Sequence, residues 1–177
     1  MPTSFRPLSP SKELRYGASM ISLGIRALRS HWEVLPSPFK LTISLTDRCN
    51  ARCRTCAIWR RGPRPDLTPG QLDHLLAGAP GASWIDLTGG EILLREDLAE
   101  VVEVVVRRSP RLFMLHFPTN GLLTEAVVEL TRHLRRLGVP KVILSISLDG
   151  PPAVHDRLRG VKGAFERALT TYRTVRE

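Results

Sequence analysis

The sequence predicts an α/β fold in which parallel strands alternate with helices, arranged either as an open sheet or as a barrel. Strand-like apolar runs and helical stretches follow one another along most of the chain. The last three strand ends are about thirty residues apart, the usual length of one strand–helix–strand unit. The predicted strands end near Thr46, Thr88, Pro118 and Leu148.

Local signals define the elements between these strand ends. Residues 1–10 contain three prolines and are predicted to be disordered, and residues 12–30 are predicted to form an amphipathic helix. We assign residues 1–36 to this N-terminal segment and residues 37–177 to the core domain. The other predicted helices span residues 69–77, 95–108, 125–137 and 162–176.

Two of the predicted strands are polar on one face. The first strand, FKLTISLT, and the fourth, VILSISLD, alternate apolar and polar residues. Strands buried on both sides are apolar on both faces, so we expect the apolar faces to contact helices and the polar faces to line a wet or ligand-filled lumen. The third strand, RLFMLHFP, is apolar on both faces, so its sequence does not show which face contacts the helices. The residues predicted to face the lumen are Lys40, Thr42, Ser44, Thr46, Asp86, Thr88, Ile143, Ser145, Ser147 and Asp149.

Composition narrows the class of protein. With 177 residues and 42% hydrophobic content, the chain can form one ordinary domain. The net charge of +9 is spread along the chain, and no RNA-binding aromatic motif or helix-turn-helix signature accompanies it. A nucleic-acid-binding module is therefore the third choice among the three functions considered. No segment resembles a secretory signal, and MISLGIRAL is too short and carries Arg26. We therefore expect a cytoplasmic protein with no membrane span.

All three cysteines lie in one stretch, RCNARCRTCAIW, directly after the first strand. An odd number of cysteines in a reducing compartment argues against disulfides, and three on a polar loop are unlike core filler. A zinc site made of Cys49, Cys53 and Cys56 would need a fourth ligand such as His74 or His116. A four-iron cluster would use three thiolates and leave one iron open for a substrate or cofactor.

With three further motifs, this stretch resembles the radical S-adenosylmethionine (radical SAM) enzymes. The resemblance covers residues 39–169 and four motifs in family order, each at a predicted strand end: CNARCRTC, TGGE, TNG and SLDG. It implies a partial barrel of six βα units, of which this chain provides about four. We therefore expect either the N-terminal part of a longer enzyme or a truncated gene product.

The resemblance also implies the cofactors and the residues that bind them. Cys49, Cys53 and Cys56 would hold a [4Fe-4S] cluster, and S-adenosyl-L-methionine (SAM) would chelate its open iron. Reductive cleavage of SAM would give a 5'-deoxyadenosyl radical that abstracts hydrogen from an unknown substrate. Thr119 and Asn120 lie beside the cofactor or substrate in relatives, or serve turn chemistry. The other implied cofactor-binding residues are Gly89, Gly90, Glu91 and Ser147.

The implied partner is a low-potential electron donor of the flavodoxin or ferredoxin type. The arginines of the cysteine stretch could favour the reduced cluster, dock an acidic donor, or form a solvated loop. These residues are Arg48, Arg52, Arg54, Arg60 and Arg61.

Two positions depart from the family pattern. Thr55 stands where relatives often have an aromatic residue, and Ile92 stands where they typically have proline. We expect Trp59 to pack in the core, with a cofactor-facing surface as the alternative.

The substrate remains unnamed, and the residues left to contact it are Asp86, His116 and the loop at 155–159. The run PPAVHDRLRG after SLDG favours peptide modification or cofactor biosynthesis. The alternative function is a non-catalytic iron-sulfur or zinc-binding fragment, or a pseudoenzyme from a truncated or split protein.

Overall fold

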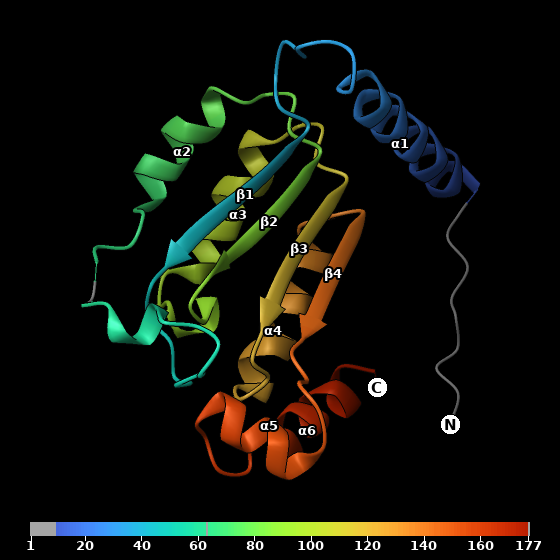
Figure 1. The fold of residues 1–177 in the computed structure, drawn as a ribbon. Helices are drawn as coiled ribbons and strands as arrows, with labels where there is room; N and C mark the ends of the chain where they lie inside the picture. The colour runs from blue at the N-terminus through green and yellow to red at the C-terminus, as the bar shows by residue number, and fades with distance from the viewer. Residues whose placement is uncertain (1–9, 63, 177) are drawn as a thin grey trace.

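The computed structural model describes residues 10–62 and 64–176 and contains one four-stranded parallel sheet (Figure 1). The strands lie side by side in chain order, so each crossover moves the chain one strand along the sheet. The predicted α/β class with parallel strands is confirmed. The strands are β1 (Lys40–Thr46), β2 (Trp84–Gly89), β3 (Met114–Thr119) and β4 (Lys141–Ile146).

Within the described residues, six α-helices and two 3-10 turns connect and flank these strands. Residues 1–10 were predicted to be disordered, and residues 1–9 of this segment lie outside the described part of the chain. The helices are α1 (Pro10–Arg29), α2 (Pro69–Ala77), α3 (Leu98–Arg108), α4 (Thr124–Arg136), α5 (Pro152–Arg159) and α6 (Ala164–Arg176), and the 3-10 turns are η1 (Ile58–Arg60) and η2 (Ile92–Leu94).

Two helix predictions differ from the structure. The helix expected to begin at Arg95 begins at Leu98, because η2 precedes it and the Arg95 side chain bonds outside the helix. Sequence reasoning also missed α5, a short helix that starts behind Pro151 and ends where Gly160 adopts a left-handed conformation. Eight residues give too few turns for a clear apolar period.

The core lies between one face of the sheet and helices α2, α3 and α4 (Figure 1). Leu45, Ile85 and Leu115 are fully buried on this face and contact the apolar side of α3. The structure also assigns the third strand, which the sequence left open. Leu115 and Phe117 face the helices, while His116 and Pro118 are only half-buried.

The opposite face of the sheet is polar, as the strand alternation predicts. Asp86 accepts hydrogen bonds from Trp84 Nε1 at 2.6 Å and from Thr42 Oγ1 at 3.2 Å, and it pairs with Lys40 at 3.1 Å. His116 continues the chain of contacts, with Nδ1 3.1 Å from Asp86 Oδ1 and Nε2 2.9 Å from Ser145 Oγ on β4. Polar contacts therefore cross the whole sheet on the side that the helices leave uncovered.

Helix α1 packs at the end of the sheet where the strands begin. The ring of Tyr16 lies edge-on to Phe113 at 4.9 Å between centroids, and Arg26 donates to the carbonyl oxygens of Ser37 and Gly81. This position leaves the opposite end of the strands open for the motif loops. Within residues 10–62 and 64–176, no helix combines the length and apolarity needed to cross a bilayer.

Candidate functional site

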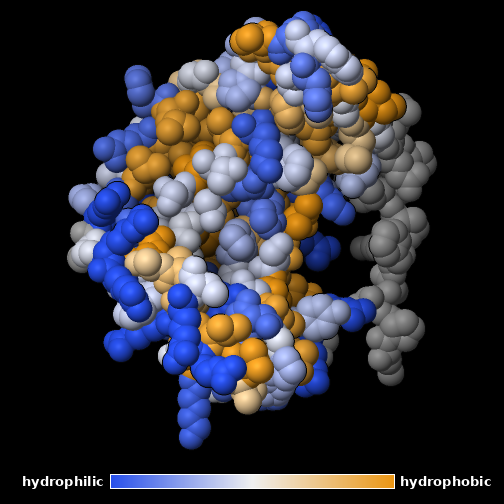
Figure 2. Space-filling view, viewed as in Figure 1, coloured by the Kyte–Doolittle hydropathy of each residue, from blue (hydrophilic) through white to orange (hydrophobic). Residues whose placement is uncertain are grey.

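The loops that follow the four strands surround one cavity of about 180 Å³. All three cysteines reach its wall, together with residues from each of the other three motifs. Hydrophilic residues gather over the lower left of the molecule, where the cysteine loop lies (Figures 1 and 2). The lining residues are Cys49, Ala51, Cys53, Cys56, Ile58, Trp59, Gly89, Gly90, Pro118, Thr119, Asn120, Ser147 and Arg159.

The three thiols are free and differ in exposure. Cys53 is buried, Cys49 is half-buried and Cys56 is exposed. Burial raises the pKa of the Cys49 thiol, and the negative charge of Glu91 adds to this effect. The amide Nδ2 of Asn120 lies 4.0 Å from Cys49 Sγ and lowers this pKa in part. Three sulfur donors line one cavity wall, and a four-iron cluster with an open iron could take its three thiolate ligands from them.

Within residues 10–62 and 64–176, no three side chains of His, Cys, Asp or Glu are already close enough together to hold a metal ion, and this includes the three cysteines. Neither of the proposed fourth ligands lines the cavity. His74 is exposed on α2, and His116 is hydrogen-bonded to Asp86 and Ser145.

The two glycines after β2 place their backbone directly against the start of the cysteine loop. Gly90 N–H donates to the Thr46 carbonyl at 2.7 Å, and Glu91 N–H donates to the Arg48 carbonyl at 2.8 Å. Gly89 has a φ of 135°, a conformation that favours glycine. A Cβ at Gly90 would lie 2.0 Å from the Arg48 carbonyl oxygen. Neither position therefore has room for a side chain. The Gly-Gly-Glu motif packs directly against the start of the cysteine loop.

The carboxylate of Glu91 joins the second motif to the third. It is 1% exposed, and its Oε2 accepts hydrogen bonds from Thr119 Oγ1 at 3.0 Å and Asn120 N–H at 2.8 Å. Its other oxygen, Oε1, has no hydrogen-bond partner within the described residues. Glu91 does not line the cavity, so its side chain holds the Thr119–Asn120 turn and keeps one acceptor free behind the wall.

Glu91→Gln is expected to change how stability depends on pH. Burial raises the pKa of Glu91 despite its hydrogen bonds, so the unfolded chain loses this proton at a lower pH than the folded protein does. The folded state then binds more protons, and the free energy of unfolding falls as pH rises from about 4.3 through the folded-state pKa. The glutamine variant should lack this fall in urea unfolding curves measured across the range.

The matched control for this variant is Glu129→Gln, which replaces an exposed glutamate on α4. It should keep the wild-type dependence on pH. An unchanged pH profile in Glu91→Gln would contradict the assignment of a buried carboxylate to this position.

Thr119 and Asn120 serve the turn and also reach the cavity. Thr119 Oγ1 accepts from Gly121 N–H at 3.1 Å, and Asn120 Oδ1 accepts from Leu122 N–H at 3.0 Å. The amide of Asn120 donates to Asn50 Oδ1 at 2.6 Å, which ties the turn to the cysteine loop. The two roles considered for these residues are therefore compatible in the structure.

The sequence and the fold both resemble known proteins. The model of the radical SAM superfamily matches residues 43–177, which is more than half of the chain. The chain belongs to the radical SAM superfamily.

Two relatives of this radical SAM chain illustrate the similarity in sequence. The AdoMet-dependent heme synthase of Methanosarcina barkeri (strain Fusaro / DSM 804) is 35% identical over 147 residues, which cover 80% of this chain and 40% of that protein. The sporulation killing factor maturation protein SkfB of Bacillus subtilis (strain 168) is 33% identical over 144 residues, covering 79% and 33%. The chain thus spans less than half the length of either relative.

The fold has a similar counterpart among solved structures. Streptococcus suis SuiB bound to S-adenosylmethionine superposes with a TM-score of 0.65 at 18% identity, covering 97% of this chain and 38% of that one. At this identity the similarity concerns the fold.

In this radical SAM chain, Arg159 approaches a cysteine from a distant part of the sequence. Its Nη1 lies 3.7 Å from Cys53 Sγ, and its guanidinium pairs with Asp149 at 2.6 and 3.0 Å. The carbonyl of Arg159 also accepts from Arg52 N–H at 2.9 Å, so the end of α5 is fastened to the cysteine loop. The sequence suggested the loop at 155–159 as a substrate contact but carried no signal for this contact.

His155, from the same predicted loop, has a different environment. It is fully buried, and its Nδ1 accepts a hydrogen bond from Asp149 N–H at 3.2 Å. Its ring therefore lies in the interior and does not line the cavity.

The expectation that Trp59 packs in the core is wrong. It is half-buried in the cavity wall, outside the hydrophobic core in which it was expected to pack. Its Nε1 donates to the Cys53 carbonyl at 3.0 Å, and Arg60 lies 5.0 Å from the centre of its ring. Thr55 is exposed on the same loop, so the aromatic surface beside the cysteines comes from Trp59.

The arginines of the cysteine loop divide into two groups. Arg48 forms an ion pair with Asp66 at 2.6 Å. The other four have exposed side chains, available for an acidic partner or for solvent: Arg52, Arg54, Arg60 and Arg61.

Proposed function

We propose that this chain is the cluster-binding part of a radical SAM enzyme core. The observation that carries the proposal is the cavity itself. It gathers three free thiols, the two glycines of the Gly-Gly-Glu motif and Ser147, directly after β4, in one wall. These elements come from separate stretches of the sequence and converge where the strands end.

Cys49, Cys53 and Cys56 would hold the [4Fe-4S] cluster, and SAM would bind at its fourth iron. Gly89 and Gly90 line the cavity and would present their backbone to the cofactor. A cluster held there would supply the electron for reductive cleavage of SAM, and the resulting 5'-deoxyadenosyl radical would abstract hydrogen from the substrate.

The chain's own groups would orient SAM in this cavity. Ser147 presents a hydroxyl from the strand next to Thr119, to whose carbonyl its own N–H donates at 3.0 Å. Glu91 Oε1 has no hydrogen-bond partner among the described residues, and we assign it as the acceptor for the ammonium group of SAM. Asn120 would screen the cluster from one side through its amide.

The relatives and the exposed surfaces indicate the substrate class and the electron donor. The relatives named above include a heme synthase and a sporulation killing factor maturation protein, and on this ground we propose cofactor biosynthesis or peptide modification. The polar face formed by Asp86, His116 and Ser145 is the surface available to a substrate. The exposed arginines of the cysteine loop favour an acidic low-potential donor of the flavodoxin or ferredoxin type.

Anaerobic reconstitution tests this function. We expect about four irons and four sulfides per chain, binding of SAM to the reconstituted protein, and formation of 5'-deoxyadenosine when a chemical reductant is added. Iron and sulfide are measured by colorimetric assay, and 5'-deoxyadenosine by liquid chromatography with mass spectrometry. Bound zinc without iron, with no cleavage of SAM, would instead support the non-catalytic alternative.

A further inference from the structure

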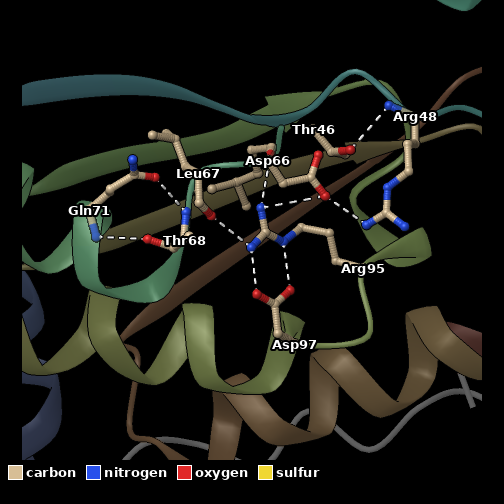
Figure 3. A network of polar contacts seen from close by, with 9 residues as sticks. Thr46, Arg48, Asp66, Leu67, Thr68, Gln71, Arg95 and Asp97 are labelled. Carbon is tan, nitrogen blue, oxygen red and sulfur yellow. Dashed lines mark hydrogen bonds and ion pairs between the residues drawn. The ribbon is translucent and has the colours of Figure 1, made fainter. Parts of the chain in front are cut away.

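A buried arginine lies beneath the cysteine loop. The side chain of Arg95 is 1% exposed, although it carries a full charge. Its Nη1 donates to the Leu45 carbonyl at 2.6 Å. Its Nη2 donates to the Leu67 carbonyl at 2.8 Å (Figure 3). Nε and Nη2 also form a two-pronged pair with Asp97 at 2.9 and 2.7 Å.

The two carbonyls belong to opposite ends of the cysteine loop. Leu45 is the next-to-last position of β1, just before the loop, and Leu67 precedes α2, just after it. One planar guanidinium therefore bonds the main chain on both sides of the segment that carries all three cysteines. Holding the ends of a long loop together removes much of its conformational freedom.

A second bridge lies beside the first. Arg48 Nη2 contacts Asp66 at 2.6 Å, and the Arg48 N–H donates to Thr46 Oγ1 at 3.1 Å (Figure 3). Burial by itself would raise the pKa of Asp66, but hydrogen bonds from Thr46 and Arg48 and the charge of Arg95 outweigh it and hold the pKa below its ordinary value. Asp66 is therefore ionised at neutral pH and pairs with both arginines.

Arg95 also joins this closure to the Gly-Gly-Glu motif. It follows Glu91 by one turn of chain, across η2, and its own N–H donates to the Ile92 carbonyl at 3.1 Å. The N–H groups of Gly90 and Glu91 bond the same start of the cysteine loop from the other side. The first and second motifs thus share one support.

The free-energy cost of burying a charge indicates that the contacts of Arg95 have a specific role. A buried charge destabilises a protein unless it is paired and hydrogen-bonded, and a well-packed apolar residue often serves stability as well or better. Lysine cannot replace the planar fork that reaches two carbonyls and a carboxylate at once. The geometry at Arg95 matches a need to fix two loop ends, beyond a need to fill the core.

We propose that Arg95 is a positioning residue that closes the base of the cysteine loop and so holds the three thiols in place for the cluster. This inference rests on the proposed function for its purpose, but the closure itself is a property of the protein without cofactors. It can therefore be tested separately from cluster chemistry.

The test compares Arg95→Lys with wild type in the reduced, cofactor-free protein. Amide hydrogen exchange is followed over residues 47–62, and the alkylation rate of buried Cys53 by iodoacetamide is measured at one pH. We expect both to rise by about tenfold because the loop opens locally, while amides of β3 such as Leu115 and Phe117 keep their protection. Iron loading on reconstitution should fall in parallel.

Two further variants make the result decisive. Arg108→Lys is the matched control, because Arg108 forms a two-pronged pair with Asp73 at 2.6 Å on the exposed surface between α3 and α2. It should leave loop exchange and Cys53 alkylation unchanged. Asp97→Asn keeps Arg95 and its contact with Asp66 but removes the two-pronged carboxylate pair, so it should shift both readouts in the same direction by a smaller factor.

Two outcomes would overturn the proposal. Equal loop exchange in Arg95→Lys, Asp97→Asn and wild type would show that the loop stays closed without this contact. An equal rise in β3 exchange would show that Arg95 serves general stability. If wild type takes up no iron, the proposed function fails, yet the measurements on the cofactor-free protein still decide the role of Arg95.

Discussion

Cys56→Ala is expected to abolish the iron-sulfur cluster while leaving the fold intact. Cys56 is exposed and lies outside the hydrophobic core, so its removal should change the free energy of unfolding by less than about 0.5 kcal/mol. It would nevertheless take away one of three thiolate ligands, and two thiolates cannot hold three corners of a cluster. Iron and sulfide content after anaerobic reconstitution, with circular dichroism of the same sample, measures both parts.

The matched control is Thr55→Ala, which changes the neighbouring exposed position without touching a thiol. It should reconstitute as wild type does. Wild-type iron content in Cys56→Ala would contradict the three-cysteine site. A marked loss of iron in Thr55→Ala would instead mean that the loop, and not the thiol, limits assembly.

Gly90→Ala is expected to disrupt both stability and the site. The added Cβ would lie 2.0 Å from the Arg48 carbonyl oxygen and 2.7 Å from its carbonyl carbon. These are backbone atoms, so relief requires the two loops to separate and strains the bond from Glu91 N–H to Arg48. Overpacking of this kind costs about 1–3 kcal/mol, and Cys49, next to Arg48, should shift with the loop.

Urea unfolding of the cofactor-free protein and iron content after reconstitution measure the two effects. Gly70→Ala is the control, because Gly70 lies in α2 with no atom within 4 Å of an added Cβ. Because Gly70 is the second residue of α2, where the penalty for glycine in a helix interior does not fully apply, that variant should be at least as stable as wild type. A Gly90→Ala protein with wild-type stability and iron content would refute the close approach of the two motifs.

Much of the fold could be predicted because its signals are local. Alternation in FKLTISLT placed Leu41, Ile43 and Leu45 toward the helices, and the structure agrees. Spacing of the strand ends indicated parallel βα units. The third strand could not be assigned, because its residues are apolar on both faces and only pairing with its neighbours turns His116 toward Asp86. The eight residues of α5 were too few to show a period.

The candidate site, like the fold, could be predicted only in part from the sequence. The four motifs pointed to the residues that the structure gathers around one cavity. Their individual roles depend on contacts between residues far apart in sequence. Glu91 is separated from the Thr119–Asn120 turn by a whole helix, yet its carboxylate bonds that turn behind the cavity wall. Arg159 lies more than a hundred residues after Cys53 and still contacts it.

By itself, the sequence determined the strand–helix alternation, the polar face of the sheet and the four motifs at strand ends. These are properties of neighbouring residues and of spacing along the chain. Only the tertiary structure decided that Arg95 bonds both ends of the cysteine loop, that Glu91 supports the neighbouring turn and that Trp59 faces the cavity. A buried polar group takes whichever partner folding brings within reach, and local sequence does not encode that partner.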